Sequence, residues 1–463
     1  MLVRAALRVA AIMSATALIA CKIEILGDAE PPGHPCQPED RRLALAAPDE
    51  AIEVGRGQRL NLVFAGQWCD TLVVASSDSL VMRATLSGLG GWGVFVSGVA
   101  PGVAMATVSV GGQQRRASVT VGPIREDFST LSGTCALTES LDAYCWNNGN
   151  PVPAHVLGMK LSQVVTGWIT CGLAALDGNA VCWSLISEPW APRVATRLPG
   201  GLSFEALSAG GADVCGLTAG GAAYCWGGSS VGGGGYSPHA VSGDLELTTL
   251  AVGKADLAQH AHACGLDIDG AAYCWGDNTY GQLGVAGGSS QSPVPVSGGF
   301  RFTSLTAGAA FTCGVTTDSL AYCWGAAGLG QLGDSGSVTT ICDGEYYNQC
   351  SSTPVRVVGG LKFTALSAGG WHVCALLESG VAYCWGDQGY GQLGAGYNVS
   401  GCGTSCGFPV PVAAGLTFRS LASDVVSTCA QSADLIIYCW GTEALGTGSS
   451  GPSFFPLRVS GQR

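Results

Sequence analysis

The cysteines are the residues whose number and spacing could do chemistry in this chain. There are 21 cysteines and six histidines among 463 residues. Fourteen cysteines form seven pairs, with nine residues between the partners in six pairs and ten in the other. The pairs are Cys135 with Cys145, Cys171 with Cys182, Cys215 with Cys225, Cys264 with Cys274, Cys313 with Cys323, Cys374 with Cys384, and Cys429 with Cys439.

This spacing favours disulfides over metal or redox chemistry. Two cysteines placed this way across a β-hairpin lie opposite each other on one face, near the Cα separation of a disulfide. A zinc site would need several thiolates together, whereas these pairs are spread one per repeat. Redox catalysts usually carry Cys-x-x-Cys. We therefore predict seven structural disulfides, each worth roughly 2–3 kcal/mol in the chain-entropy model.

The histidines form no catalytic or metal-binding arrangement in the sequence. His262 and His372 each stand two residues before a repeat cysteine, which predicts a structural, hydrogen-bonded role. His260 could join His262 on one strand face, but no third ligand lies nearby in sequence. The glycine run 232–235 is followed by neither a lysine nor a helix pattern, which argues against phosphate binding. We predict no catalytic residue, no metal and no cofactor, and that the chain is not an enzyme. The remaining histidines are His34, His155 and His239.

Two inserts carry further cysteine pairs and aromatic residues. Residues 334–353 contain Cys342 and Cys350, and residues 395–408 contain Cys402 and Cys406. A disulfide in each insert would make the loop rigid and prearrange it for binding. Aromatic, small-residue loops suit protein recognition. The alternative is a tolerated insertion that the disulfide merely holds in place. The candidate partner-binding residues are Tyr346, Tyr347, Asn348, Tyr397 and Phe408.

The elements that position these groups are short strands repeated seven times. Trp follows the second cysteine of every pair. An apolar strand such as Phe302 to Leu305 precedes each hairpin, and strands that begin with proline, such as Pro293 to Val296, lie between hairpins. Proline suits an outer strand, where a missing N–H costs little. The intervals between first cysteines, 36 to 61 residues, fit about four strands each. The sequence thus predicts an all-β chain with a seven-bladed propeller over residues 127–463.

The repeats also suggest how the ring closes. The first hairpin has no proline strand before it, and the last proline strand, 456–459, has no hairpin after it. We expect this C-terminal strand to complete the blade that begins at Phe128. Such closure would pair both terminal strand edges.

The N-terminus has the pattern of an export signal. Arg4 and Arg8 precede an apolar run, residues 9–20, that is too short to span a bilayer. The run ends in Leu18-Ile19-Ala20-Cys21, which resembles the lipobox of bacterial lipoproteins, where the cysteine is acylated. The alternative is an ordinary signal peptide with a chance cysteine. The resemblance implies a signal peptide over 1–21 and an exported protein held in the bacterial cell envelope by lipid at Cys21. With Lys22 next, the enteric sorting rule would favour the outer membrane or cell surface.

Two regions separate this signal from the propeller. Residues 22–47 are rich in proline and charge and predict a tether. Residues 48–122 alternate apolar and polar residues and predict a small β-sandwich. The segments 97–102, 106–110 and 119–121 resemble bacterial immunoglobulin-like domains of group 2. Acylation of Cys21 would leave 20 cysteines, an even number. Cys36 and Cys69 could then pair with each other.

The net charge of the chain limits the classes of partner that it can bind. The net charge is −12 and no basic block is present, which argues against nucleic acid. No further apolar segment is long enough for a membrane span, so lipid would be the only membrane attachment. We expect a protein partner and a monomeric chain.

The later repeats resemble a known family. The units from Phe302 to Gly325 and from Phe363 to Gly386 are similar to regulator of chromosome condensation repeats. So are Gly281-Gln282-Leu283-Gly284 and its two later copies, at 330–333 and 391–394. The resemblance covers residues 127–463 and implies a seven-bladed propeller with four-stranded blades. The first three blades lack the Gly-Gln-Leu-Gly turn. The guanine-nucleotide exchange activity behind the family's name depends on particular loops and is not expected in an exported chain.

Two hypotheses for function follow. The first is a non-enzymatic, lipid-anchored binding or scaffold protein whose propeller carries the partner surface. The second is an extracytoplasmic enzyme inhibitor or a hydrolase that uses the propeller loop face. An inhibitor would bind its protein target through the insert loops, as an extracellular bacterial propeller that inhibits β-lactamases does. A hydrolase would need clustered carboxylates at the channel mouth. A purely structural surface protein is a third reading.

Overall fold

The computed structural model describes residues 23–24, 42–45, 52–53, 57–60, 62–65, 73–77, 82–87, 93–98, 101–110, 113–124, 127–147, 150–156, 159–184, 196–228, 231, 235–243, 245–254, 260–342, 349–397, 399–413, 415–442, 445–447 and 451–462. Within these residues every regular element but a single 3₁₀ position is a β-strand, which confirms the all-β class. The chain divides into two compact units, residues 1–125 with 460–463 and residues 126–459.

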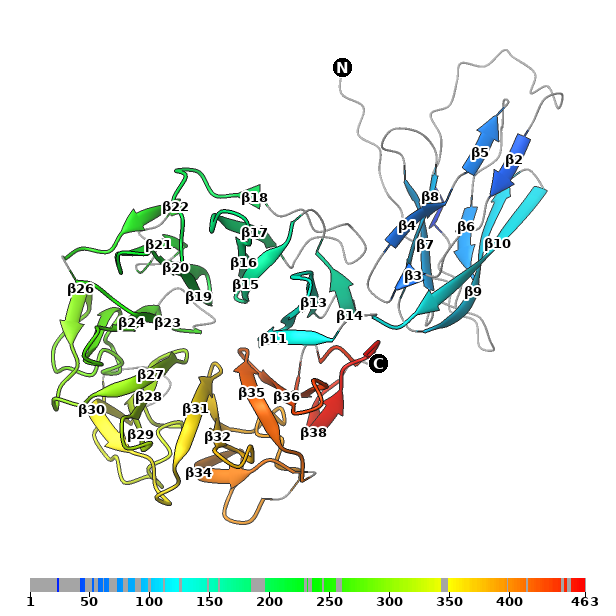
Figure 1. Ribbon diagram of the computed structural model, residues 1–463. Helices are drawn as coiled ribbons and strands as arrows, with labels where there is room; N and C mark the ends of the chain where they lie inside the picture. Colours follow the sequence, from blue (N-terminus) through cyan, green and yellow to red (C-terminus); the bar gives the residue numbers. More distant parts are fainter. Residues whose placement is uncertain are drawn as a thin grey trace. The chain divides into compact units, whose positions relative to one another are not determined.

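The second unit is a propeller (Figure 1). In the described residues its strands form seven antiparallel sheets of four strands each, with the strands of each sheet in chain order. The first three blades are β11 (Phe128–Ser132), β12 (Cys135–Thr138), β13 (Ala143–Asn147), β14 (Asn150–His155); β15 (Leu161–Val165), β16 (Ile169–Ala174), β17 (Ala180–Ser184), β18 (Thr196–Arg197); β19 (Ala206–Gly210), β20 (Asp213–Leu217), β21 (Ala223–Gly227), β22 (Gly235–Ala240). The other four are β23 (Thr249–Val252), β24 (His262–Leu266), β25 (Ala272–Gly276), β26 (Ser290–Pro295); β27 (Phe302–Ala307), β28 (Phe311–Thr316), β29 (Ala321–Ala326), β30 (Cys350–Arg356); β31 (Phe363–Ala368), β32 (His372–Leu377), β33 (Ala382–Asp387), β34 (Ser405–Pro411); β35 (Phe418–Ser423), β36 (Ser427–Ser432), β37 (Ile437–Gly441), β38 (Ser453–Arg458).

Each blade follows the order of the repeat. The apolar strand lies nearest the axis, the cysteine hairpin is in the middle, and the proline strand is outermost. The outer position leaves one strand edge unpaired, so the proline loses no ladder bond there. The prediction of an outer proline strand is thus confirmed in the blades where that proline is described, as with Pro293 in β26 and Pro354 in β30.

The predicted closure by the C-terminal strand is wrong. β38 pairs with β37 and completes the last blade, while β14 completes the first. One full blade consists of the apolar strand before a hairpin, the two hairpin strands, and the proline strand that follows them. Counted this way, no strand is left over at either end of the propeller. The last and first blades instead meet side by side, where Gln431 Nε2 donates to the Phe128 carbonyl at 2.6 Å. The final residues, 460–463, group with the N-terminal unit, so the propeller unit ends at 459 rather than 463.

The hairpin cysteines form the seven predicted disulfides, which confirms that prediction for all fourteen residues. Every pair is directly opposed across its two strands, with Cα atoms 4.0–4.1 Å apart. The bonded pairs are Cys135 with Cys145, Cys171 with Cys182, Cys215 with Cys225, Cys264 with Cys274, Cys313 with Cys323, Cys374 with Cys384, and Cys429 with Cys439.

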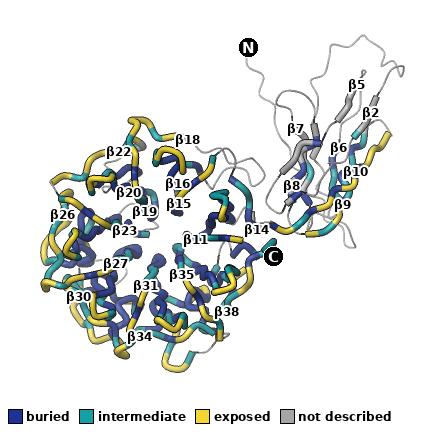
Figure 2. The backbone as a smooth tube through the Cα atoms, in the orientation of Figure 1, coloured by how far each residue is buried: buried dark blue, intermediate teal, exposed yellow. Residues whose placement is uncertain are grey.

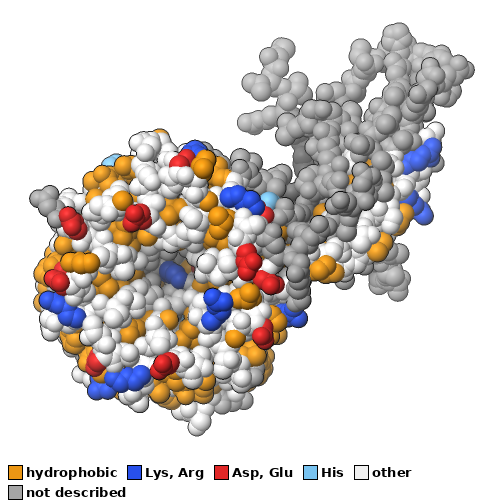
Figure 3. All heavy atoms as spheres, viewed as in Figure 1, with side chains coloured by type: hydrophobic (Ala, Val, Ile, Leu, Met, Phe, Trp, Pro, Cys, Tyr) orange, Lys and Arg blue, Asp and Glu red, His pale blue; other side chains and the backbone are white. Residues whose placement is uncertain are grey.

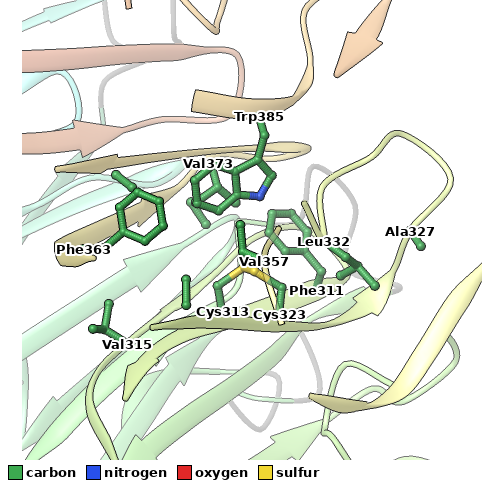
Figure 4. Close-up of a cluster of buried hydrophobic side chains, with 13 residues drawn as sticks. Phe311, Cys313, Val315, Cys323, Ala327, Leu332, Val357, Phe363, Val373 and Trp385 are labelled. Carbon is green, nitrogen blue, oxygen red and sulfur yellow. A yellow bond between two sulfur atoms is a disulfide. The ribbon is translucent and has the colours of Figure 1, made fainter. Parts of the chain in front are cut away.

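These disulfides lie in the cores between blades. In the cluster drawn in Figure 4, Cys313 and Cys323 of the fifth blade pack with Phe363 and Trp385 of the sixth. The same arrangement recurs at the other blade junctions from the first to the seventh blade. The repeated tryptophan therefore packs against the preceding blade's disulfide, which explains why Cys and Trp repeat together.

The N-terminal unit consists of three antiparallel or mixed sheets in its described residues. Their orders are β1-β6-β9-β10-β3, β4-β8-β7 and β2-β5. Alternate residues of the last strand, Ala117, Val119 and Val121, are buried, as expected for a half-buried strand. The strands are β1 (Ile23–Glu24), β2 (Arg42–Leu45), β3 (Ile52–Glu53), β4 (Gly57–Leu60), β5 (Leu62–Ala65), β6 (Val73–Ser76), β7 (Met82–Ser87), β8 (Gly93–Gly98), β9 (Gly102–Val110) and β10 (Gln113–Gly122).

The predicted tether is partly structured. β1 pairs with β6, and β2 pairs with β5 from Arg42↔Ala65 to Leu45↔Leu62. The strands of this unit therefore begin before residue 48.

Candidate functional site

The candidate surface lies on the loops that join the third strand to the outer strand in the fifth and sixth blades. These loops connect β29 to β30 and β33 to β34. Each holds one of the predicted extra disulfides, Cys342–Cys350 with Cα atoms 6.0 Å apart and Cys402–Cys406 at 4.9 Å. Both predictions of a disulfide within the insert are confirmed.

These disulfides tie the inserts to the blade body. Cys350 and Cys406 belong to outer strands and are buried, whereas Cys342 and Cys402 are partly exposed. In each pair, one cysteine belongs to the outer strand and the other to the insert, so the disulfide restrains the insert loop against its own blade. Such restraint lowers the entropy that the loop would lose on binding a partner.

Tyr397 is the exposed aromatic residue of the sixth-blade insert. Its side chain is 66% exposed. Its ring centroid lies 4.5 Å from that of Phe454 and 5.7 Å from that of Phe455, both on β38 of the seventh blade. The backbone N–H of Gly396 donates to the Phe454 carbonyl at 2.9 Å, which holds the insert against β38. We call Tyr397, Phe454 and Phe455 the aromatic patch.

Tyr397 and Phe455 are the members of this patch whose exposed surface is available for contact with a partner. Phe455 is 42% exposed, and Phe454 is partly buried. Neither phenylalanine is predictable from the sequence as part of this surface, because both stand in the proline strand of the next blade. Only the folded ring brings them to the Tyr397 loop. Tyrosine and phenylalanine rings on a restrained loop are typical anchors of protein interfaces.

The other predicted partner-binding residues divide into two groups. Phe408 lies on β34 and packs into the hydrophobic cluster between the sixth and seventh blades, so it is a partly buried support of the insert rather than a free anchor. Gly401 of the insert lies against the Phe408 ring, which explains the difference. Tyr346, Tyr347 and Asn348 lie outside the described residues, as do Cys21, Cys36 and Cys69.

The repeat histidines have the structural role that their positions predict. His262 and His372 are fully buried, and their Nε2 atoms lie 2.9 Å and 2.8 Å from the hydroxyls of Thr312 and Thr428 of the next blade. Burial lowers the pKa of His262 to about 4 and that of His372 to about 3, so both rings are neutral near pH 7. They link adjacent blades and face no open site.

An acidic residue close to His260 belongs to a turn. Asp277 lies 3.5 Å from His260 Nδ1 and accepts hydrogen bonds from the Gln282 amide at 2.7 Å and the Thr279 N–H at 3.1 Å. Burial opposes ionisation of Asp277, but its interactions with His260, Thr279 and Gln282 outweigh burial and lower the pKa of Asp277 to about 2. The glutamine of the Gly-Gln-Leu-Gly turn thus orders its own loop. Within the described chain no three His, Cys, Asp or Glu side chains gather as metal ligands.

The comparisons with known proteins agree with this geometry. Residues 269–315 and 363–392 each match the regulator of chromosome condensation (RCC1) repeat. Yeast RCC1 (Prp20), solved with Kap60 bound, is 19% identical with a TM-score of 0.57, over 74% of this chain and 90% of that chain. Human WBSCR16 is 19% identical with a TM-score of 0.55, over 67% and 84%. The chain therefore carries RCC1 repeats and shares the propeller fold of these proteins.

No helix among the described residues has both the length and the apolar character that a bilayer crossing requires.

Proposed function

We propose that this chain is a non-catalytic binding protein of the bacterial cell envelope, anchored by lipid at Cys21, whose propeller binds a protein partner. The aromatic patch carries the proposal. It combines exposed rings of Tyr397 and Phe455 with an insert that the Cys402–Cys406 disulfide restrains. Rigid aromatic anchors surrounded by polar loop residues give most of the binding energy at protein interfaces.

The fold supports a protein partner. The yeast propeller of the same fold was solved with Kap60 bound, and the binding of Prp20p to Gsp1p and histones was studied with its structure. At 19% identity these similarities concern the fold alone, so they do not identify the partner of this chain. We do not propose nucleotide exchange.

The anchoring part of the proposal rests on the sequence Leu18-Ile19-Ala20-Cys21. The N-terminal unit, with its immunoglobulin-like sequence pattern over 48–122, would serve as a spacer between lipid and a monomeric propeller. Replacement Cys21→Ser should move the protein from the membrane fraction to the soluble fraction and abolish labelling by a radioactive fatty acid. Retention of the label would exclude Cys21 as the acylated residue.

Hydrolysis is the less favoured alternative. It would need clustered carboxylates at the channel mouth, and the described residues that line the axial cavity include no Asp or Glu. An inhibitor would use the same aromatic patch and differs only in its partner.

The decisive experiment compares capture of partners from envelope extracts by three versions of the soluble protein. The test variant is Tyr397→Ala/Phe455→Ala. The control variant is Leu176→Ala/Ile268→Ala, which removes apolar residues that are 93% and 84% exposed on hairpin turns of other blades. We expect the test variant to lose a protein that the wild type and the control retain. Equal capture by all three would refute the aromatic patch as the partner surface.

A further inference from the structure

The propeller encloses a polar cavity on its axis. The cavity has a volume of 230 Å³ and is lined by residues of the inner strands. Figure 2 shows the inner strands around this axis, and Figure 3 shows a hollow at the centre of the ring with a basic side chain inside it. Since a water molecule occupies about 30 Å³ in the liquid, the cavity has room for several waters or a small anion.

Each blade contributes one hydroxyl or amine to the cavity lining. In blade order these groups are Ser132, Thr166, Ser208, Lys254, Thr306, Ser367 and Ser423. Of the lining residues that the structure describes, Lys254 alone is charged, and the others besides these hydroxyl residues are apolar or glycine. Among the described residues, the lining therefore offers donors and one positive charge, while the nearest carboxylate, that of Asp424, lies behind the lining residue Gly133.

Three of the hydroxyls are oriented as donors by the neighbouring blade. The hydroxyl oxygens of Ser208, Thr306 and Ser367 accept the backbone N–H groups of Val252, Ala368 and Ser423 at 3.0, 2.8 and 2.8 Å. An oxygen that accepts such a bond retains its own hydrogen for donation. The packing of inner strands thus prearranges three O–H donors around the axis.

Lys254 adds a cation to these donors. It extends from the fourth blade across the ring and donates from Nζ to the Ser423 carbonyl of the seventh. An ammonium group has three hydrogens, so this bond leaves two for a ligand. Loss of hydration lowers the pKa of Lys254, and the nearby Asp424 carboxylate, which does not line the cavity, partly offsets that effect. An anion in the cavity would stabilise the charged ammonium group of Lys254, which burial destabilises.

We propose that the axial cavity binds a small oxyanion, a carboxylate or phosphate group, held by the Lys254 ammonium and the hydroxyls of Ser208, Thr306 and Ser367. Hydroxyls and an ammonium group around a confined space match the several acceptor oxygens of such a group. This site lies on the axis and is independent of the aromatic patch.

Amine footprinting of the intact protein tests the site directly. The chain has four lysines, Lys22, Lys160, Lys254 and Lys362. Acetylation by a small activated ester is followed at each lysine by mass spectrometry, with sodium phosphate or sodium acetate added at a constant ionic strength set by sodium chloride. We expect phosphate or acetate to slow acetylation of Lys254 saturably, by about tenfold or more, and to leave exposed Lys160 and Lys362 unchanged. The more effective anion identifies the ligand class.

A variant pair gives an independent readout. Phosphate or acetate should raise the melting temperature of the wild type and of Lys362→Met but not of Lys254→Met. Lys362→Met removes the same charge from an exposed position outside the cavity. If Lys254→Met does not fold, the wild-type footprint still decides. Absence of saturable protection, or equal protection by chloride alone, would overturn the oxyanion site and leave Lys254 as a link between opposite blades only.

Discussion

The disulfide between Cys313 and Cys323 offers a quantitative test of how the blades are held together. Its cysteines are separated by 10 residues in sequence and are fully buried between the fifth and sixth blades. Closing a loop of this size stabilises the folded chain by about 3 kcal/mol in the chain-entropy model. Removing two buried sulfur atoms beside Phe363 and Trp385 adds about 1–2 kcal/mol. The variant Cys313→Ala/Cys323→Ala should therefore lose about 4–5 kcal/mol of unfolding free energy.

A second variant compares this disulfide with one that closes a shorter loop and has one buried cysteine, Cys406. Cys402→Ala/Cys406→Ala opens a loop with a separation of 4, for which the same model gives about 2 kcal/mol. Guanidinium unfolding followed by tryptophan fluorescence, analysed for free energy and slope, measures both variants against the wild type. A loss below about 1 kcal/mol for the buried pair, or equal losses for the two pairs, would refute the assignment of the hairpin disulfides to the blade cores.

Three further outcomes follow from the same structure. Gln431→Leu should cost about 1–3 kcal/mol in the same assay, because it removes the hydrogen bond across the joint between the last and first blades; no loss would show that this joint is held by other contacts. Burial holds the pKa of His262 and His372 below the 6.5 of an unfolded histidine, so the unfolded chain binds more protons. Above pH 6.5 these histidines should not lower the unfolding free energy; between pH 6.5 and pH 4 it should fall by up to about 1.4 kcal/mol per pH unit for each ring. A plot of unfolding free energy against pH that is as steep for His372→Gln as for the wild type would contradict this. Gly394→Ala should cost about 2 kcal/mol more than Gly299→Ala in denaturant unfolding. Both glycines have φ near +65°, but only at Gly394 would the added Cβ meet the Trp440 indole, at 2.7 Å; equal costs would contradict the tight fit there.

The repeat was predictable because its chemistry is local. Each cysteine pair stands on one hairpin, so its spacing alone predicts strand register and disulfide. The proline strands were placed at the outer edge for a similar local reason, namely the missing N–H. Trp385 and its equivalents reveal a further rule that acts between blades, where each indole packs on the preceding disulfide.

Which strands share a blade, and which residues come together in each candidate site, depend on contacts between residues that are far apart in the sequence. Nothing in the strand Pro456 to Val459 distinguishes pairing with the preceding hairpin from pairing with the first one, since both would satisfy its hydrogen bonds. Lys254 contacts a carbonyl 169 residues away, and Tyr397 meets aromatic residues of the next blade. The exposure of Phe408 could not be read from the sequence, because it depends on packing against the cluster between the sixth and seventh blades.

The most direct test of the proposed function is site-specific photo-cross-linking in cells. A photoreactive phenylalanine analogue replaces Tyr397 in one variant and Leu176, an exposed residue of the second blade, in another. We expect the position 397 variant to form one discrete cross-linked protein adduct, identified by mass spectrometry, and the position 176 variant to form none. Absence of an adduct at 397, or the same adduct at both positions, would contradict the aromatic patch as the partner-binding surface.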